Sequence, residues 1–157
     1  MNTIRVKELY QLHGTASTNV SEDASLEDVI TLLGHEPRLQ GVFLTDSEQK
    51  FSGVITPMDL AKWAHIQMFD GKGRREIPIS TFYRIADARK ARDLPRSDYG
   101  SLGVRETDSL QTALDKMLNY EEDIIPVLDN EGHILGDLRL SEVLMKALEV
   151  GKQRKEA

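Results

Sequence analysis

Cysteine is absent from the 157-residue chain, which excludes disulfide bonds, thiolate nucleophiles and zinc sites built on cysteine. Long apolar runs are absent too. None approaches the roughly 18 residues of a membrane span, and the first residues, MNTIRVKELY, lack the apolar stretch of a signal peptide. With 39% hydrophobic and 29% charged residues, the composition is typical of a globular protein of one domain or two small ones, which we expect in the cytoplasm.

Basic residues are outnumbered by acidic ones overall, 20 to 26, but not in one segment. The net charge of −6 argues against nucleic acid as the main partner of the whole surface. Residues 65–96, however, contain eight basic and four acidic side chains. We interpret this segment first as a solvated connector. A phosphate-bearing ligand, an acidic partner surface and nucleic acid are alternatives that the sequence leaves open.

The chain contains one sequence unit twice. Residues 20–26 (VSEDASL) recur 84 positions later as 104–110 (VRETDSL), and residues 51–60 recur 83 positions later as 134–143. Residues 6–9 (VKEL) likewise reappear as 91–94 (ARDL). A repeat unit that cannot close its own core stacks on its copy, so we expect function at the interface between the copies.

Apolar spacing places the same elements in each copy. Ser25 and Ser109 are suitable N-caps for two helices, each with apolar residues on one face. Two short apolar runs around a polar turn follow each helix and predict a hairpin, at 42–55 and at 124–138. A second helix comes next, at 57–68 and at about 141–149, and the stretches around Val20 and Val104 predict a leading strand. Each copy is therefore predicted to be β-α-β-β-α, an α+β fold.

This tandem order resembles the CBS-domain pair, also called a Bateman module, over residues 6–149. The most specific stretches are 124–136 (IIPVLDNEGHILG) and 53–60 (GVITPMDL). The resemblance implies two repeats packed around a pseudo-twofold axis, two clefts between their sheets, and a ligand such as AMP, ADP, ATP or S-adenosylmethionine. It divides the chain into a first repeat with its leader (1–68), a basic connector (69–90), a second repeat (91–150) and a charged tail (151–157).

The junction Thr56-Pro57-Met58-Asp59 has a structural and a functional interpretation. As structure, threonine caps a helix, proline takes its first position and Asp59 its third. As function, the free amides of the helix N-terminus can hold a phosphate while the threonine hydroxyl donates to it. The resemblance implies that Thr56 and Asp59, with Val54 and Ile55, contact the ligand, Asp59 at the ribose hydroxyls.

The second copy departs from this pattern at both positions. Arg139 occupies the position of Thr56, and Glu142 that of Asp59. Arginine has no side-chain oxygen for capping, although its planar fork suits phosphate. Glutamate can still reach a ribose, from one methylene further away.

The strand before the junction shows the reverse difference. The resemblance implies that Ile125, Pro126 and Val127 line an adenine pocket in the second copy, where the first copy has Phe43, which can fill such a pocket or stack on a base. Each copy keeps one part of the binding pattern and changes another. We therefore expect one working site rather than two, in the first copy.

Catalysis has little support in the sequence. The four histidines show no metal-ligand spacing, and no nucleophile elbow or phosphate-cradling glycine loop is present. We expect a regulatory protein without enzymatic activity, cofactor or metal, which senses an adenosine-type molecule and signals to an unidentified regulated protein. The alternative is a ligand-free dimerisation scaffold. A homodimer is implied by the resemblance and loosely supported by apolar residues on the second helices: Leu60, Trp63, Ala64, Met68, Val143, Leu144, Ala147 and Leu148.

Overall fold

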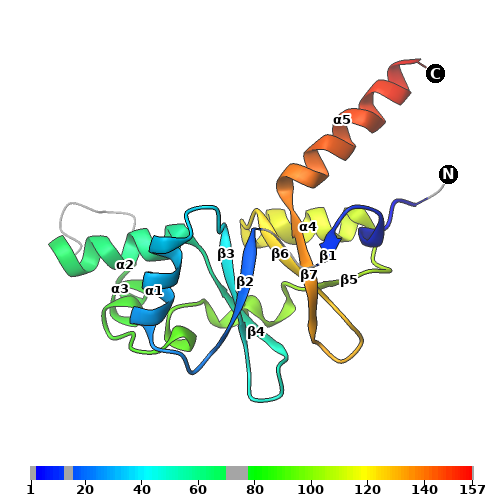
Figure 1. The fold of residues 1–157 in the computed structure, drawn as a ribbon. Helices are drawn as coiled ribbons and strands as arrows, with labels where there is room; N and C mark the ends of the chain where they lie inside the picture. Colours follow the sequence, from blue (N-terminus) through cyan, green and yellow to red (C-terminus); the bar gives the residue numbers. More distant parts are fainter. Residues whose placement is uncertain (1–2, 13–15, 70–77, 157) are drawn as a thin grey trace. The chain divides into compact units, whose positions relative to one another are not determined.

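The computed structural model describes residues 3–12, 16–69 and 78–156 (Figure 1). The chain divides into two compact units, which we call unit 1 (residues 1–15 and 101–157) and unit 2 (residues 16–100). No helix in the described ranges is long and apolar enough to cross a membrane.

Unit 2 is built on a three-stranded sheet. Its strands are β2 (Ser17–Ser21), β3 (Gly41–Thr45) and β4 (Phe51–Ile55), in the order β2-β3-β4, with β2 parallel and β4 antiparallel to β3. Its helices are α1 (Leu26–His35), α2 (Pro57–Phe69) and α3 (Ile79–Ala86), and the 3-10 helices η2 (Ala91–Asp93) and η3 (Ser97–Ser101) follow α3.

Unit 1 is built on a four-stranded sheet. Its strands are β1 (Gln11–Leu12), β5 (Val104–Arg105), β6 (Ile124–Leu128) and β7 (Ile134–Arg139), in the order β1-β7-β6-β5. The 3-10 helix η1 (Val6–Glu8) precedes β1, and the helices are α4 (Leu110–Tyr120) and α5 (Leu140–Glu156).

The predicted β-α-β-β-α order is confirmed in both repeats. The first repeat contains β2, α1, β3, β4 and α2, and the second contains β5, α4, β6, β7 and α5. Both predicted caps are present. Ser25 Oγ accepts from the amide of Asp28 and Ser109 Oγ from the amide of Thr112, each at 3.1 Å.

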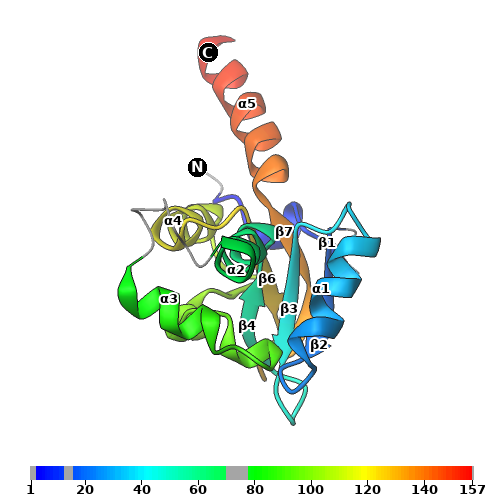
Figure 2. The same ribbon diagram turned by 90° about the vertical axis from the view of Figure 1, so that its left-hand side faces the viewer.

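Two helical segments go beyond the prediction. The segment 79–86, which falls in the expected connector, forms α3, because its apolar face packs on α2 and contributes Ile85 to the core (Figure 2). A helix this short depends on such packing. Helix α5 continues past the expected end near Glu149 to Glu156, with Arg154 and Lys155 in its last turn, where cations complement the helix dipole. The basic residues Lys72, Arg74 and Arg75 lie outside the described residues.

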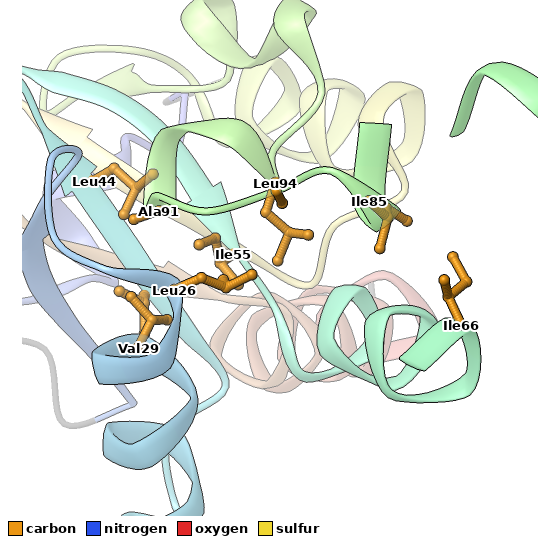
Figure 3. Close-up of a cluster of buried hydrophobic side chains, with 10 residues drawn as sticks. Leu26, Val29, Leu44, Ile55, Ile66, Ile85, Ala91 and Leu94 are labelled. Carbon is orange, nitrogen blue, oxygen red and sulfur yellow. The ribbon is translucent and has the colours of Figure 1, made fainter. Parts of the chain in front are cut away.

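The core of unit 2 includes residues from the beginning of the second repeat. In Figure 3, Ala91 and Leu94 lie beside Leu44 and Ile55 of the first repeat's hairpin. Ala91 and Leu94 are 0% and 1% exposed, respectively. The segment 89–94, which we call the second leader, therefore packs on the first repeat.

Backbone hydrogen bonds fix the second leader in unit 2. The amide of Ala91 donates to the carbonyl of Ala24 at 2.8 Å, and the amide of Arg92 donates to that of Glu22 at 3.0 Å. Lys90 also forms an isolated antiparallel bridge with Ser25.

The first leader, residues 4–9, makes the equivalent bonds in unit 1. The amide of Val6 donates to the carbonyl of Asp108 at 2.9 Å, and the amide of Lys7 donates to that of Glu106 at 3.0 Å. Each compact unit thus combines the main part of one repeat with the leader of the other, which is why the units differ from the sequence repeats.

Candidate functional site

The junction between β4 and α2 is closed by Thr56 and Asp59, which hydrogen-bond to each other. Asp59 Oδ2 accepts from the Thr56 amide at 2.9 Å and from the Thr56 hydroxyl at 3.1 Å. The Asp59 amide in turn lies 3.4 Å from the Thr56 hydroxyl oxygen and 3.1 Å from the Thr56 carbonyl oxygen. Donors and acceptors are satisfied reciprocally, as in a capping box, so the structural interpretation of this junction holds.

This geometry still leaves one carboxylate oxygen of Asp59 available. Within the described residues, no hydrogen bond reaches Asp59 Oδ1, and the side chain is only partly buried. Thr56 is 8% exposed, and its hydroxyl both donates to and accepts from Asp59. A ligand with two hydroxyl groups can therefore bind Asp59 Oδ1 directly, whereas a bond to the Thr56 hydroxyl requires that hydroxyl to leave its present partner.

The hairpin before this junction presents Phe43 and Val54 on one face. The two residues are opposite each other in the β3–β4 register, and both are 0% exposed. Phe43 packs edge-on against Phe51, with ring centroids 6.0 Å apart. Side chains alternate along a strand. Ile55 accordingly lies on the other face, in the hydrophobic cluster, and does not share a face with Phe43 and Val54.

The junction between β7 and α5 has the same backbone contact with different side chains. Glu142 Oε1 accepts from the Arg139 amide at 3.0 Å, which matches the bond from Asp59 to Thr56 in unit 2. The same Glu142 oxygen lies 3.3 Å from the Nε of Arg139. Arg139 therefore takes part in the helix cap as a cation, although it cannot cap with an oxygen.

Asp137 completes this second junction, and the sequence analysis missed it. Its carboxylate Oδ1 lies 3.4 Å from Arg139 Nε, and its side chain is 0% exposed. The equivalent residue of the first repeat is Val54. An aspartate among the apolar residues of a buried strand was the signal that could have pointed to it.

The second junction has more carboxyl groups than guanidinium groups. Two carboxylates, from Asp137 and Glu142, lie beside a single guanidinium, that of Arg139. The side chains of Arg139 and Glu142 are 17% and 13% exposed. Burial raises the pKa of Glu142, an effect that the hydrogen bond from the Arg139 amide partly opposes. The guanidinium is engaged by carboxylates, so phosphate would have to compete with them.

The remaining predicted residues of unit 1 lie on β6. Pro126 is opposite Asp137 in the register, and therefore on the face of Asp137 and Arg139, whereas Ile125 and Val127 alternate to the other face. All three β6 residues are buried. Proline is tolerated at this central strand because β5 pairs only with positions 127 and 128, beyond it.

The ten predicted ligand residues thus fall into two groups. Phe43, Val54, Ile55, Thr56 and Asp59 are in unit 2, and Ile125, Pro126, Val127, Arg139 and Glu142 are in unit 1. Among the described residues, no group of three His, Asp or Glu side chains is arranged to hold a metal ion.

The sequence matches the model of the CBS domain family twice, over residues 15–66 and 91–149. These matches cover most of the chain. The chain therefore belongs to the CBS domain family, and its two repeats form a CBS-domain pair, as the sequence predicts.

Solved structures share this fold. A CBS domain-containing protein from Thermotoga maritima is 23% identical with a TM-score of 0.72, over 95% of this chain and 97% of that one. CBSX2 in complex with AMP is 20% identical with a TM-score of 0.68, over 94% and 98%. The CBS domain pair of protein MJ0100, in complex with 5-methylthioadenosine and S-adenosyl-L-methionine, is 16% identical with a TM-score of 0.65, over 96% and 99%. A comparison with curated protein sequences gives no match.

Proposed function

We propose that this protein is a regulatory module that binds an adenosine-containing molecule and transmits its presence to a partner protein. Solved CBS-domain pairs of the same fold carry AMP in one case, and 5-methylthioadenosine with S-adenosyl-L-methionine in another. The observation that carries the proposal is the Thr56–Asp59 junction. There Asp59 Oδ1 accepts no hydrogen bond within the described residues. Asp59 is in the first turn of α2, and backbone amides at a helix N-terminus can bind phosphate.

The first repeat is the better candidate for the working site. Its junction offers a free carboxylate oxygen to ribose hydroxyls and a helix N-terminus to phosphate. In the second repeat, Glu142 and Asp137 both face Arg139, so less capacity is left for a ligand there. Signalling requires that the ligand bind two conformations of the protein with different affinity.

A thermal-shift panel tests the proposal with adenosine, AMP, ADP, ATP and S-adenosylmethionine. A ligand at about 100 times its dissociation constant adds about 2.7 kcal/mol to the free energy of unfolding, which raises the melting temperature by several degrees. The Asp59→Ala variant should lose this shift. If no compound produces a shift at millimolar concentration, the sensor proposal is wrong.

Ser25→Ala is the matched control for Asp59→Ala. It also removes a helix cap of unit 2, at α1, and should cost a similar amount of stability, about 1 kcal/mol. Ser25→Ala should keep the full ligand-induced shift. If both variants lose the ligand-induced shift equally, the loss results from reduced stability, and Asp59 is not a ligand-binding residue.

A ligand-free interaction scaffold is the second candidate, favoured by apolar side chains on α5. Leu144, Met145 and Leu148 are 58%, 68% and 56% exposed, and α5 extends away from the sheet of its own unit (Figures 1 and 2). Light scattering coupled to gel filtration measures whether the chain is a dimer. If it is, Leu144→Glu with Leu148→Glu should give a monomer.

A further inference from the structure

A cavity of about 520 Å³ opens in unit 2, at the end of β4 away from the Thr56 junction. Ser52, the second residue of β4, lines it, while Thr56 follows the last residue. Thr56 is four positions after Ser52 along an extended strand, which places the two residues about 13 Å apart. The cavity is therefore a different place from the junction.

Two arginines in the wall of the cavity are held in position by their neighbours. Arg84, on α3, donates a hydrogen bond from one guanidinium nitrogen to the carbonyl of Leu94. Arg92, on the second leader, places Nη1 3.2 Å from Asp23 Oδ1. A guanidinium has five N–H donors, so each keeps donors for a ligand. The side chains of Arg92 and Asp23 are 49% and 57% exposed, so a phosphate would share Arg92 with the Asp23 carboxylate.

A third arginine adds charge to the same wall. The guanidinium of Arg96 stacks over the ring of Tyr99, 4.7 Å from its centroid. Tyr99 is 3% exposed and gives the stacked cation a fixed support. Three guanidinium groups around one cavity favour an anion, and phosphate matches their planar geometry.

Hydroxyl groups in the cavity suit the oxygen atoms of such a ligand. The Oγ of Ser52 is shielded from solvent and has no hydrogen-bond partner within the described part of the chain. A buried hydroxyl without a partner is costly, so the Ser52 hydroxyl would be satisfied if it turned toward a ligand oxygen in the cavity. Thr81 lines the cavity from the first turn of α3, where the N-cap residue Pro78 makes no side-chain cap.

Acidic side chains in the wall narrow the ligand class. Asp93 accepts from the amides of Arg89 and Lys90 at 3.0 and 2.9 Å, bonds that lower its pKa and tie it to the leader. Glu22 also lines the cavity. The Glu22 carboxylate would repel a bare anion or an acidic peptide, whereas a ligand hydroxyl group would donate a hydrogen bond to it.

We propose that this cavity binds a phosphorylated small molecule that also carries hydroxyl groups, namely a sugar phosphate. The phosphate lies at Arg84 and Arg92, and a hydroxyl group faces Glu22. The volume of about 520 Å³ is in the usual range for small-molecule sites. This site is additional to the Thr56 junction and does not depend on it.

Calorimetric titration of the full chain with ribose 5-phosphate, which has no adenine ring, tests the proposal. Ribose 5-phosphate should bind, and ribose should not. Arg92→Gln should weaken binding about tenfold or more, as expected for the loss of a charge-assisted bond to phosphate. Arg89→Gln makes the same charge change on the same segment but lies outside the cavity lining, and should leave binding unchanged.

The result is independent of the proposed function. Asp59→Ala should keep ribose 5-phosphate binding, and Arg92→Gln should keep any binding of adenosine, which carries no phosphate. Arg84→Lys keeps the charge but loses the planar fork, so the folded variant should bind ribose 5-phosphate more weakly. If Arg84→Lys does not fold, Arg92→Gln still tests the proposal. No binding of ribose 5-phosphate at millimolar concentration, equal affinity in wild type and Arg92→Gln, or binding only of an acidic peptide such as polyglutamate would each overturn the proposal.

Discussion

In unit 2, Thr56 and Asp59 close the first turn of α2 by bonding to each other, whereas in unit 1 Glu142 closes α5 and shares its carboxylate with a cation, Arg139. The backbone contact is the same in both, from the third residue of the helix to the amide that precedes it. The side chains give one junction a neutral hydroxyl and the other a buried charge cluster. The duplicated backbone has thus been kept while the chemistry at its ends has diverged.

The largest expected effect concerns the two leaders, each of which packs in the unit formed mainly by the other repeat. Val6 is 0% exposed in unit 1, so Val6→Asp buries a charge there and should cost about 3–5 kcal/mol. Hydrogen exchange should then speed up at β6 and β7, while β3 and β4 keep their protection. Ala91→Asp, also at a fully buried position, should produce the opposite pattern. If β3 and β4 of the Val6→Asp variant lose their protection from hydrogen exchange, the first leader does not belong to unit 1 alone, which would contradict the exchange of leaders.

The next effect separates the two junctions. Arg139→Ala removes the cation that lies between Asp137 and Glu142, so two carboxylates lose an ion pair inside the protein. We expect a loss of about 3 kcal/mol in the free energy of unfolding, measured in urea. Adding Asp137→Val, the residue found at the equivalent position of the first repeat, should recover most of that loss. If the double variant is as unstable as Arg139→Ala, Asp137 is not the source of the penalty.

A smaller effect is expected at the Thr56 junction. Thr56→Ala deletes the hydroxyl that bonds Asp59, and an N-cap of this kind contributes about 1 kcal/mol. Thr56→Ser keeps the hydroxyl and should be close to wild type in the same urea titration. A loss for Thr56→Ala as large as that for Arg139→Ala would remove the contrast between the junctions.

The smallest effect depends on pH. The pKa of Glu142 is raised by burial in the folded state, so the folded chain binds this proton more tightly than the unfolded chain. The resulting stabilisation is complete below the unfolded pKa of about 4.3 and is lost as pH rises through the folded value. Glu142→Gln removes this titration. Its stability relative to wild type should therefore increase between pH 4 and pH 7, and a difference independent of pH would contradict the assignment.

The sequence predicted what depends on local pattern. The order β-α-β-β-α, both hairpins and the caps at Ser25 and Ser109 follow from spacing and residue type over a few positions. The exchange of leaders could not be predicted, because the bond from the Arg92 amide to the Glu22 carbonyl joins residues far apart in the sequence. Helix α3 was missed because tertiary packing stabilises it.

At the site, the sequence predicted the Thr56–Asp59 cap but not the bond from the Arg139 amide to Glu142. Thr56 with Asp59, and Arg139 with Glu142, were identified from one alignment of the two copies. The reciprocal use of the Thr56 hydroxyl was predictable from capping chemistry. Asp137 was missed although strand alternation alone places it on the face of Arg139; its complete burial and its 3.4 Å contact with Arg139 Nε came from the structure.

The exchanged leaders also set an order for folding. Unit 2 is one continuous stretch, residues 16–100, so every partner it needs, the second leader included, has been synthesised before β5 begins. Unit 1 joins residues 1–15 to residues 101–157, and its first leader must wait for a partner more than 90 positions away. Distant partners slow folding, and domains generally fold from the N-terminal side during synthesis. On the ribosome, the middle of this chain should become structured before its beginning.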